Sequence, residues 1–260
     1  MKSLKRILPI PFATTAFLLL ANASAMADDS SKSQGILDPA GPPAQHISDL
    51  WYVISIPALL VTLLVGGAII YASFRFRRKN EDEVPRQVGG NNALEFTWSL
   101  VPALILLTIF VLTLFQFPFV RNAPASAQGA MTVKVSGRQW AWSFVYPNVK
   151  NVKVGQKVTA GGTPYTTASN DLVIPAGSVV SLDIVSADVI HSWSIPRLQG
   201  RIDAIPGQTN HSWIEANSPG AYYGQCSEFC GLSHAAMTAR VLALTQEDWD
   251  AWYSKQVGGP

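Results

Sequence analysis

The sequence predicts a membrane-anchored protein in which a two-helix transmembrane hairpin precedes an all-β sandwich. Three observations predict this fold class. Two long segments without charged residues lie in the first half of the chain, and short segments of alternating apolar and polar residues lie in the second half. Both cysteines lie in one loop before the last alternating segment, which predicts a functional site on the β domain.

The composition favours a membrane protein and excludes a nucleic-acid partner. Hydrophobic residues make up 48% of the chain and charged residues only 14%, whereas about 25% charged residues is usual in soluble domains. The formal net charge of +2 is too small to indicate binding to a phosphate backbone. Two cysteines cannot form a disulfide framework, so they form one bridge or act as ligands.

Residues 1–27 have the pattern of a secretory signal peptide. Three basic residues begin the segment, an apolar core follows at 12–20, and 25–27 offers a small-x-small cleavage site. An uncleaved, rather short first membrane helix is the alternative. The signal pattern predicts that the following residues are exported.

A transmembrane hairpin is expected over residues 50–120. The preceding segment, 28–49, is rich in Ser, Pro and Gly and is expected to be flexible, with His46 as a solvated loop residue. Segments 51–74 and 96–120 carry no charge. Each is long enough to cross a hydrocarbon core of about 30 Å at ~1.5 Å per residue, so each is predicted to be a transmembrane helix.

Charge between the two helices predicts how the hairpin is oriented. Four of the five residues at 75–79 are Lys or Arg, and such clusters remain on the cytoplasmic side of a membrane. The part 121–260 then lies outside, which predicts a bacterial inner-membrane protein with a periplasmic domain. The lipid bilayer is therefore a predicted partner.

Short strands separated by Gly, Pro and Asn turns are predicted in the outer part. The Gly- and Thr-rich stretch 149–170 is expected to be a loop, and 247–255 a closing helix with Thr245 as its N-cap. Several short strands at this spacing are typical of a β-sandwich. The predicted strands are 131–136, 139–146, 171–174, 179–185, 212–215, 221–224 and 237–244.

The loop before the last predicted strand carries a soft set of metal ligands. Cys226, Cys230, His234 and Met237 lie within twelve residues. Thiolate, imidazole and thioether favour copper over magnesium, calcium or manganese, which prefer oxygen. Because loops cluster at the ends of a sandwich, His191, which follows the predicted strand 179–185, is the expected remote ligand.

A single-copper site needs one thiolate, two histidines and a weak axial methionine, so this loop has one cysteine more than it requires. Cys226 and Cys230 are therefore predicted to bridge two copper ions, each of which takes one histidine. A disulfide is the first alternative and a zinc site the second. Zinc has no use for a methionine, and its cysteines are usually closer in sequence. His211 has no comparable context and is expected to be structural.

At this point the sequence resembles a known family, subunit II of the haem-copper cytochrome c oxidases, over nearly its whole length. The motif Cys-Ser-Glu-Phe-Cys-Gly-x-x-His-x-x-Met at 226–237 carries the resemblance, supported by His191-Ser-Trp, by Asp203-Ala-Ile-Pro-Gly and by Tyr222-Tyr-Gly-Gln. The resemblance implies a cupredoxin-like Greek-key sandwich with a binuclear copper A centre.

The resemblance also implies the ligands of that centre. The main-chain carbonyl of Glu228 would be a further copper ligand, and the Glu228 side chain would reach a magnesium ion shared with subunit I. The implied copper ligands from side chains are His191, Cys226, Cys230, His234 and Met237.

Two further residues take roles from the resemblance. Trp140, in Gly-Arg-Gln-Trp-Ala-Trp, is where electrons would enter from cytochrome c, whereas Trp142 is expected to be a core residue. Glu95, at the cytoplasmic end of the second helix, would lie at the entrance of a proton path into subunit I. A solvated helix-end charge is the ordinary alternative for Glu95. Ala141 and Val145 stand where many relatives have tyrosine and glutamate.

The implied function is to accept electrons from reduced cytochrome c and pass them to the haem of subunit I. Oxygen is reduced to water there, coupled to proton pumping, with subunit III as a further partner. A membrane-tethered copper carrier or assembly protein is the main alternative. The cysteines oppose a quinol oxidase subunit, which typically lacks the copper ligands, and the two predicted helices oppose a soluble nitrous-oxide reductase.

Overall fold

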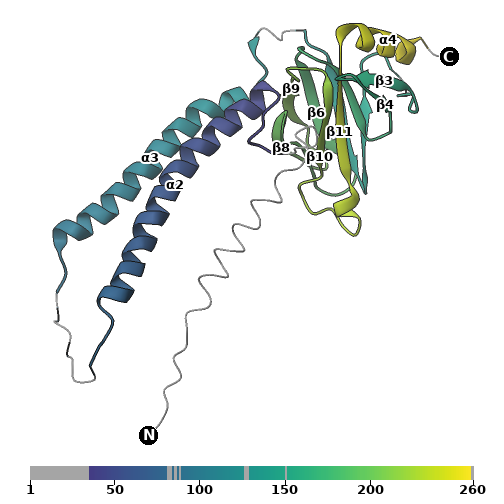
Figure 1. Ribbon diagram of the computed structural model, residues 1–260. Helices are drawn as coiled ribbons and strands as arrows, with labels where there is room; N and C mark the ends of the chain where they lie inside the picture. Colours follow the sequence, from purple (N-terminus) through teal and green to yellow (C-terminus); the bar gives the residue numbers. More distant parts are fainter. Residues whose placement is uncertain are drawn as a thin grey trace. The chain divides into compact units, whose positions relative to one another are not determined.

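The structure, a computed structural model, describes residues 35–80, 84, 87, 89–125, 129–149 and 151–258. Two long helices precede a β domain, and a short helix ends the described chain (Figure 1). The predicted signal peptide, 1–27, lies outside the described residues.

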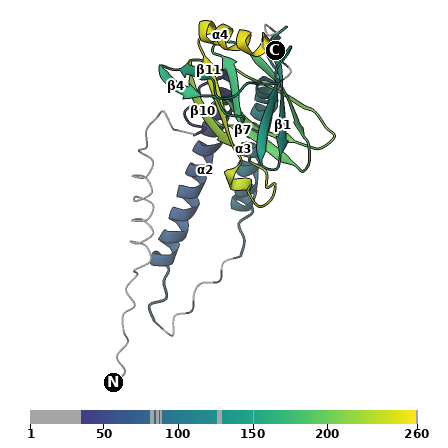
Figure 2. The same ribbon diagram turned by 90° about the vertical axis from the view of Figure 1, so that its right-hand side faces the viewer.

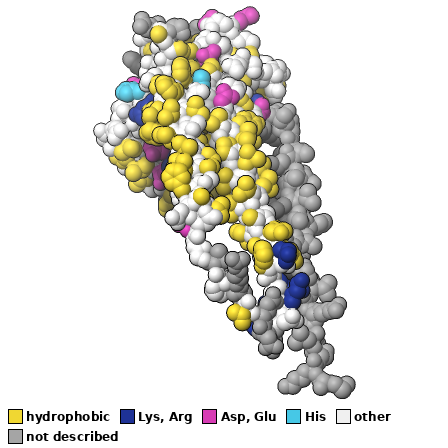
Figure 3. Space-filling view, turned by 90° about the vertical axis from the view of Figure 1, so that its left-hand side faces the viewer, with side chains coloured by type: hydrophobic (Ala, Val, Ile, Leu, Met, Phe, Trp, Pro, Cys, Tyr) yellow, Lys and Arg dark blue, Asp and Glu magenta, His cyan; other side chains and the backbone are white. Residues whose placement is uncertain are grey.

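Helices α2 (Pro42–Arg75) and α3 (Asn92–Arg121) form the hairpin and pack against each other. Two prolines at the start of α2 suit its first turn, where their missing N–H groups would have no partner within the helix. Asn91 caps α3 by accepting hydrogen bonds from the N–H groups of Ala93 and Leu94. Both helices are long and apolar enough to cross a membrane, and their apolar side chains are exposed along the hairpin (Figure 3).

Helix α2 begins nine residues before the expected start at 51, which corrects the prediction that all of 28–49 is flexible. The polar first turns are helical because they pack against α3. Nδ1 of His46 lies 2.9 Å from Oε1 of Gln116, and its ring stacks on Phe119 at 5.2 Å. His46 is therefore a half-buried helix residue rather than a solvated loop residue.

The segment just before α2 is hydrogen-bonded to the β domain. The N–H of Ala40 donates to the carbonyl of Arg197 at 2.6 Å, and the N–H of Asn217 donates to the carbonyl of Ala40 at 2.8 Å. Arg197 also forms an ion pair with Asp38 at 2.9 Å. These bonds give the lead-in a fixed main-chain path that its composition alone does not predict.

The β domain is a sandwich, as predicted (Figures 1 and 2). One sheet has the strand order β2-β1-β6-β9 and the other β10-β11-β5, with two separate hairpins, β3-β4 and β7-β8. Parallel pairs join β1 to β6 and β11 to β5. The strands are β1 (Thr132–Arg138), β2 (Ala141–Val145), β3 (Lys157–Ala160), β4 (Thr163–Thr166), β5 (Asp171–Pro175), β6 (Val180–Ser186), β7 (His191–Ile195), β8 (Gln199–Ala204), β9 (Asn210–Ile214), β10 (Gly220–Gln225) and β11 (Thr238–Leu244).

Alternating burial on β1 and β6 confirms the pattern from which these strands were predicted. Val133 and Val135 of β1 and Leu182 and Ile184 of β6 are fully buried, with polar residues between them. Burial of such side chains contributes about 1.5–3 kcal/mol each. The core therefore lies between the two sheets.

Two hairpins were not predicted. Strands β3 and β4 lie inside 149–170, which was expected to be a loop. Gly161 and Gly162 make the turn between them, with φ of +59° and +79°, and a Gly-Gly pair at positive φ is a known hairpin signal. All five residues of β7 are buried, so β7 lacks the alternation that reveals a half-buried strand.

Helix α4 (Gln246–Val257) agrees with the predicted closing helix at 247–255. Thr245 caps it, since its side-chain oxygen accepts a hydrogen bond from the N–H of Asp248 at 3.2 Å. Trp249 and Trp252 are buried against the core. Helix α4 lies at one end of the sandwich and the β10–β11 loop at the other (Figure 1).

Candidate metal centre

The loop 226–237 joins β10 to β11 and is closed at its base by the main chain. The N–H of Cys226 donates to the carbonyl of Met237 at 2.9 Å. The N–H of Ser227 donates to the carbonyl of Ser192 at 2.9 Å, which ties the loop to β7 beside His191. Two segments distant in sequence are thereby held together at one end of the sandwich.

Five sequence-predicted ligands meet here, four from the loop and His191 from β7. The Sγ atoms of Cys226 and Cys230 are 3.8 Å apart. Nδ1 of His191 lies 3.9 Å from Sγ of Cys226, and Nδ1 of His234 lies 3.5 Å from Sγ of Cys230. Sδ of Met237 lies 3.8 Å from Sγ of Cys230. Each cysteine sulfur therefore has one imidazole nitrogen beside it.

The carbonyl oxygen of Glu228 completes the set, at 3.2 Å from Sγ of Cys226. The two weak donors are thus divided, with the carbonyl beside Cys226 and the thioether of Met237 beside Cys230. The binuclear arrangement of these donors stays a prediction.

The donor atoms fit a soft metal. Both cysteines are free thiols, and their separation of 3.8 Å is less than twice a metal–thiolate bond, which is about 2.3 Å for zinc. A bound ion can therefore contact both sulfurs. Burial, and then the neighbouring Cys226, raise the pKa of the Cys230 thiol to about 11, so a metal that binds here must displace its proton.

The centre is buried. His191 is 0% exposed and Cys226, Cys230 and Met237 are at most 3% exposed, whereas His234 is half-buried. Burial keeps His191, Cys226, Cys230 and Met237 out of contact with solvent. Such a site suits electron transfer better than exchange of the metal with another protein.

Asp188 holds the ring of His191 in place. Its Oδ1 lies 2.8 Å from Nε2 of His191, and its Oδ2 accepts the N–H of Gln139 at 2.7 Å. Although burial raises the pKa of Asp188, the hydrogen bonds from Gln139, His191 and Val189 outweigh it and hold the pKa below its ordinary value. Sequence reasoning missed this bond, although the spacing of three residues offered a signal.

Trp140 lies beside the same loop. Its indole Nε1 donates to the carbonyl of Cys230 at 3.2 Å, and Nε2 of Gln139 donates to the same carbonyl at 2.8 Å. Trp140 is 38% exposed, while Trp142 is 1% exposed and packs edge-on against Trp193 at 5.1 Å. The two tryptophans therefore differ as expected, with Trp142 in the core.

The Glu228 carboxylate has its partner on β8. It forms an ion pair with Arg201 of β8, which also pairs with Asp203 at 3.3 Å. The side chains of Glu228 and Arg201 are 41% and 49% exposed. Sequence reasoning placed Glu228 at a shared magnesium ion and did not foresee Arg201 as its partner.

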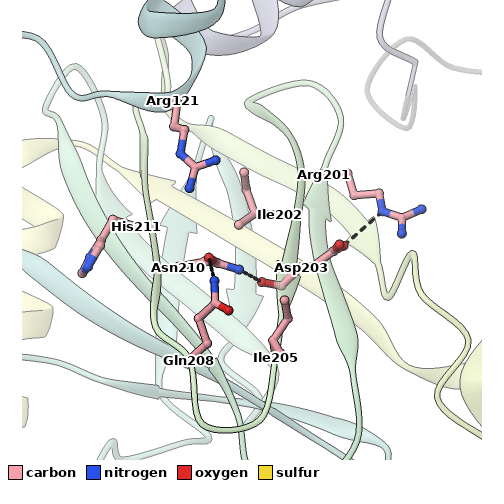
Figure 4. Close-up of a pocket in the computed structure, with 8 residues that line it drawn as sticks. All are labelled: Arg121, Arg201, Ile202, Asp203, Ile205, Gln208, Asn210 and His211. Atoms are coloured by element: carbon pink, nitrogen blue, oxygen red, sulfur yellow. Dashed lines mark hydrogen bonds and ion pairs between the residues drawn. The ribbon is translucent and has the colours of Figure 1, made fainter.

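A polar cavity of about 390 Å³ lies beside β8 and β9, next to Arg201 and Asp203 (Figure 4). Asn210 donates to the carbonyl of Asp203 at 2.6 Å and accepts from Gln208 at 2.9 Å. None of the five predicted copper-ligand side chains lines this cavity. His211, which does line it, is exposed and pairs with Asp183 at 2.7 Å, and its structural role stays a prediction.

Glu95 is not part of the metal centre. It lies exposed in the first turn of α3, where a negative charge is stabilised by the positive end of the helix dipole by about 0.3–1 kcal/mol. This position is consistent with the ordinary alternative for a helix-end glutamate. Its predicted role in a proton path stays a prediction.

Comparison with known proteins identifies the family. The family model of the cytochrome c oxidase subunit II periplasmic domain matches residues 131–244, and that of the transmembrane domain matches residues 30–116. Cytochrome c oxidase subunit 2 of Alkalihalophilus pseudofirmus is 36% identical over 255 residues, which cover 96% of this chain and 68% of that protein. The Cereibacter sphaeroides protein of the same name is 31% identical over 275 residues, covering 94% and 89%.

Among solved structures, the periplasmic domain of subunit II of cytochrome oxidase (CoxB) of Bradyrhizobium japonicum is similar. It is 34% identical, covers 48% of this chain and 92% of its own, and has a TM-score of 0.40. The family matches place two membrane helices before an outer domain, and the His–Cys–Cys cluster is compatible with copper. The chain belongs to the cytochrome c oxidase subunit II family.

Proposed function

We propose that this chain accepts electrons from reduced cytochrome c at a binuclear copper A centre and passes them to the haem of subunit I. Oxygen is reduced to water in subunit I, and the reaction is coupled to proton pumping. One observation carries this proposal. Two thiols 3.8 Å apart each face the Nδ1 atom of a different histidine, which is a donor set for two ions rather than one.

The residues of this chain would hold the copper pair, which when bound supplies a one-electron relay. The thiolates of Cys226 and Cys230 and the Nδ1 atoms of His191 and His234 would hold the copper ions. Met237 and the carbonyl of Glu228 would be weaker donors to them. Burial of the cluster excludes water, and Asp188 fixes which nitrogen of His191 faces the metal.

Trp140 is the proposed acceptance point for electrons. It is partly exposed, and its indole donates a hydrogen bond to the carbonyl of a ligand residue, Cys230. From a donor that touches the Trp140 ring, the path to the Cys230 thiolate therefore crosses one hydrogen bond and then runs within Cys230 itself. The buried Trp142 offers no such surface.

Magnesium is proposed at the Glu228 carboxylate, shared with subunit I. In the chain alone this carboxylate pairs with Arg201, so the ion would bind as Glu228 leaves that pair. Because both side chains are more than 40% exposed, the exchange costs little, in the range of 0–1 kcal/mol for a surface ion pair.

The chain is proposed to assemble with subunits I and III in a bacterial inner membrane, with the copper domain on the periplasmic face. Residues 1–27 are proposed as a cleaved signal peptide, the hairpin of α2 and α3 as the membrane anchor and 121–260 as the copper domain. Glu95, on the cytoplasmic side in this topology, is proposed as the entrance of a proton path into subunit I.

A membrane-tethered copper carrier is the second candidate function. A carrier exchanges its metal with other proteins, which requires accessible ligands. Here Cys226, Cys230 and Met237 are at most 3% exposed, and this burial favours the oxidase subunit.

Purification of the tagged chain from its native membrane tests the choice. We expect a haem-containing subunit to co-purify and the complex to consume oxygen with reduced cytochrome c. A chain that purifies with copper but without haem, and transfers its copper to an apo-protein, would support the carrier instead.

A further inference from the structure

A second polar cavity, of about 490 Å³, lies where helix α3 meets the β domain. Arg121, the last residue of α3, lines it together with Ser181 and Asp183 of β6 and His211 of β9. Arg121 and His211 also line the neighbouring cavity beside β8, where the Arg121 side chain extends from the end of α3 toward the side chains of the β domain (Figure 4). We refer to the 490 Å³ cavity as the α3-end cavity.

The charge of Arg121 has no ionic partner among the residues that the structure describes. Its guanidinium lies over the Phe117 ring, 6.0 Å from the ring centroid, and the ion pairs of the described chain involve other basic groups. A guanidinium presents five N–H donors in a planar fork that matches the oxygens of a phosphate or a carboxylate. Because Arg121 is exposed, these donors are available to a ligand.

Asp183 supplies the opposite charge on the same cavity. Its Oδ1 lies 2.7 Å from Nδ1 of His211, and an uncharged imidazole does not neutralise a carboxylate. Lys134, its register neighbour on β1, forms no ion pair with it in the described part of the chain. Asp183 and Arg121 thus line one cavity without pairing with each other. An anion-binding and a cation-binding group therefore face the same polar space.

The α3-end cavity lies at the level of lipid headgroups. Helix α3 carries no charge between Glu95 and Arg121. At ~1.5 Å per residue these two residues are about 39 Å apart, close to the ~40–45 Å thickness of a bilayer with its headgroups. Phe117 and Phe119, just before Arg121, are 54% and 57% exposed, as expected of side chains that face acyl chains.

The lining of the cavity favours a headgroup over an acyl chain. Seven of its nine lining residues are polar or charged, which opposes an apolar occupant. Its volume of about 490 Å³ is in the ~300–1,000 Å³ range of small-ligand sites. A ligand that carries a phosphate and, a few bonds away, a primary ammonium matches both charges. Each contact would be a charge-assisted hydrogen bond, the phosphate with Arg121 and the ammonium with Asp183.

We propose that the α3-end cavity binds the headgroup of one phospholipid of the outer leaflet. The lipid is zwitterionic with a primary ammonium, the chemistry of phosphatidylethanolamine. Its phosphate binds Arg121 and its ammonium binds Asp183, while the hydroxyls of Thr132 and Ser181 can donate to phosphate oxygens. The site goes beyond the proposed function, because none of the proposed copper ligands lines it. A bound lipid would hold the end of α3 against the outer sheet.

Native mass spectrometry of the delipidated full chain in detergent tests the proposal. The chain is titrated with phosphatidylethanolamine, phosphatidylglycerol and phosphatidylcholine that carry the same acyl chains, and with O-phosphoethanolamine as the headgroup alone. We expect one phosphatidylethanolamine per chain, bound about tenfold more tightly than the other two lipids, as for one charge-assisted hydrogen bond. Phosphatidylglycerol has no ammonium, and the quaternary ammonium of phosphatidylcholine has no N–H to donate. The soluble headgroup should bind more weakly than the lipid, because it has no acyl chains.

Two variants separate the two contacts. Arg121→Gln should weaken binding of all three lipids about tenfold, because each carries a phosphate. Asp183→Asn should weaken only phosphatidylethanolamine, to the level of phosphatidylcholine. Arg138→Gln is the matched control, since it removes the same charge from an exposed residue at the other end of β1 from Thr132. Equal thermal unfolding midpoints without lipid check that the variants are folded.

Several outcomes would overturn the proposal. Equal affinity of the wild-type chain for the three lipids, or unchanged lipid binding by Arg121→Gln, would show that this cavity does not select a headgroup. O-phosphoethanolamine bound as tightly as the lipid would make the ligand a free phosphate ester. If Arg121→Gln kept lipid binding but lost the haem subunit in the native membrane, the cavity would be a contact between subunits. The lipid titration needs neither copper nor haem, so its failure is distinct from failure of the proposed function.

Discussion

Nε2 of His191 lies 2.8 Å from Oδ1 of Asp188, and this bond leaves Nδ1 of the same ring facing the thiol of Cys226. A carboxylate that binds the outer nitrogen of a metal-ligating histidine fixes the ring and raises its basicity. Asp188 is therefore a positioning residue of the proposed copper centre. It forms this bond from the loop just before β7, on which His191 lies.

Substitution of Asp188 should weaken copper binding without removing it. We expect Asp188→Leu to lower copper affinity about 10–100-fold, as measured by competition with a chelator, because the ring loses its orientation. Asp188→Asn keeps a hydrogen-bonding group and should lose less. Equal affinity for wild type and Asp188→Leu would show that the bond does not position His191.

Copper uptake should release protons. The pKa of Cys230 is raised to about 11, so at neutral pH its thiol is protonated and must lose the proton to become a ligand. The apparent copper affinity should therefore rise with pH through the neutral range and level off as pH passes about 11. Calorimetry in buffers of different ionisation enthalpy measures the released protons, and an affinity independent of pH between 6 and 8 would contradict the thiolate ligand.

Replacement of Trp140 should slow the arrival of electrons while the centre stays intact. For Trp140→Phe we expect turnover with cytochrome c to fall about tenfold or more, ~1.4 kcal/mol in activation free energy, with an unchanged copper spectrum. Trp252→Phe, a buried position on α4, is a control for loss of an indole. Unchanged turnover for Trp140→Phe would remove its proposed role.

Glu95→Gln should slow oxygen reduction in the assembled complex. The substitution removes a charge that stabilises the start of α3 by only about 0.3–1 kcal/mol, so assembly should not suffer. Oxygen consumption and the yield of complex are measured together. A normal rate at normal yield would leave Glu95 as a helix-end charge.

Arg240→Met should destabilise the β domain. Arg240 pairs with Asp171 at 2.7 Å, and the Asp171 side chain is 1% exposed. Removal of one partner leaves a buried charge, which costs about 3–5 kcal/mol, so we expect a clear fall in the thermal unfolding midpoint of the purified chain. The double variant Arg240→Met with Asp171→Leu should recover part of the loss, and an equal loss in both variants would contradict a buried-pair cost.

Elements with a strong periodic pattern were predictable, and those defined by tertiary contact were not. The apolar runs of α2 and α3 and the alternation of β1 and β6 identify these elements directly. Strand β7 is buried on both faces, so it has no alternation to detect. The start of α2 depends on the contact of His46 with Gln116, which no local pattern contains.

The same division holds at the site. The residue types of Cys226, Cys230 and Met237 predict a soft-metal loop by themselves, and the sandwich brings His191 to it. The bond of Asp188 to His191 and the ion pair of Arg201 with Glu228 were not predicted. The first crosses a turn and the second joins β8 to the loop, and amino-acid composition indicates neither contact. Their contacts are properties of the folded chain.

Paramagnetic resonance of the copper-loaded full chain in detergent, with metal analysis of the same sample, tests the binuclear centre most directly. The close approach of Cys226 and Cys230, each with its own histidine, predicts two copper ions per chain. It also predicts the hyperfine pattern of one electron shared equally by two copper nuclei, which Cys226→Ser should abolish. One copper per chain with the pattern of a single nucleus would contradict the account.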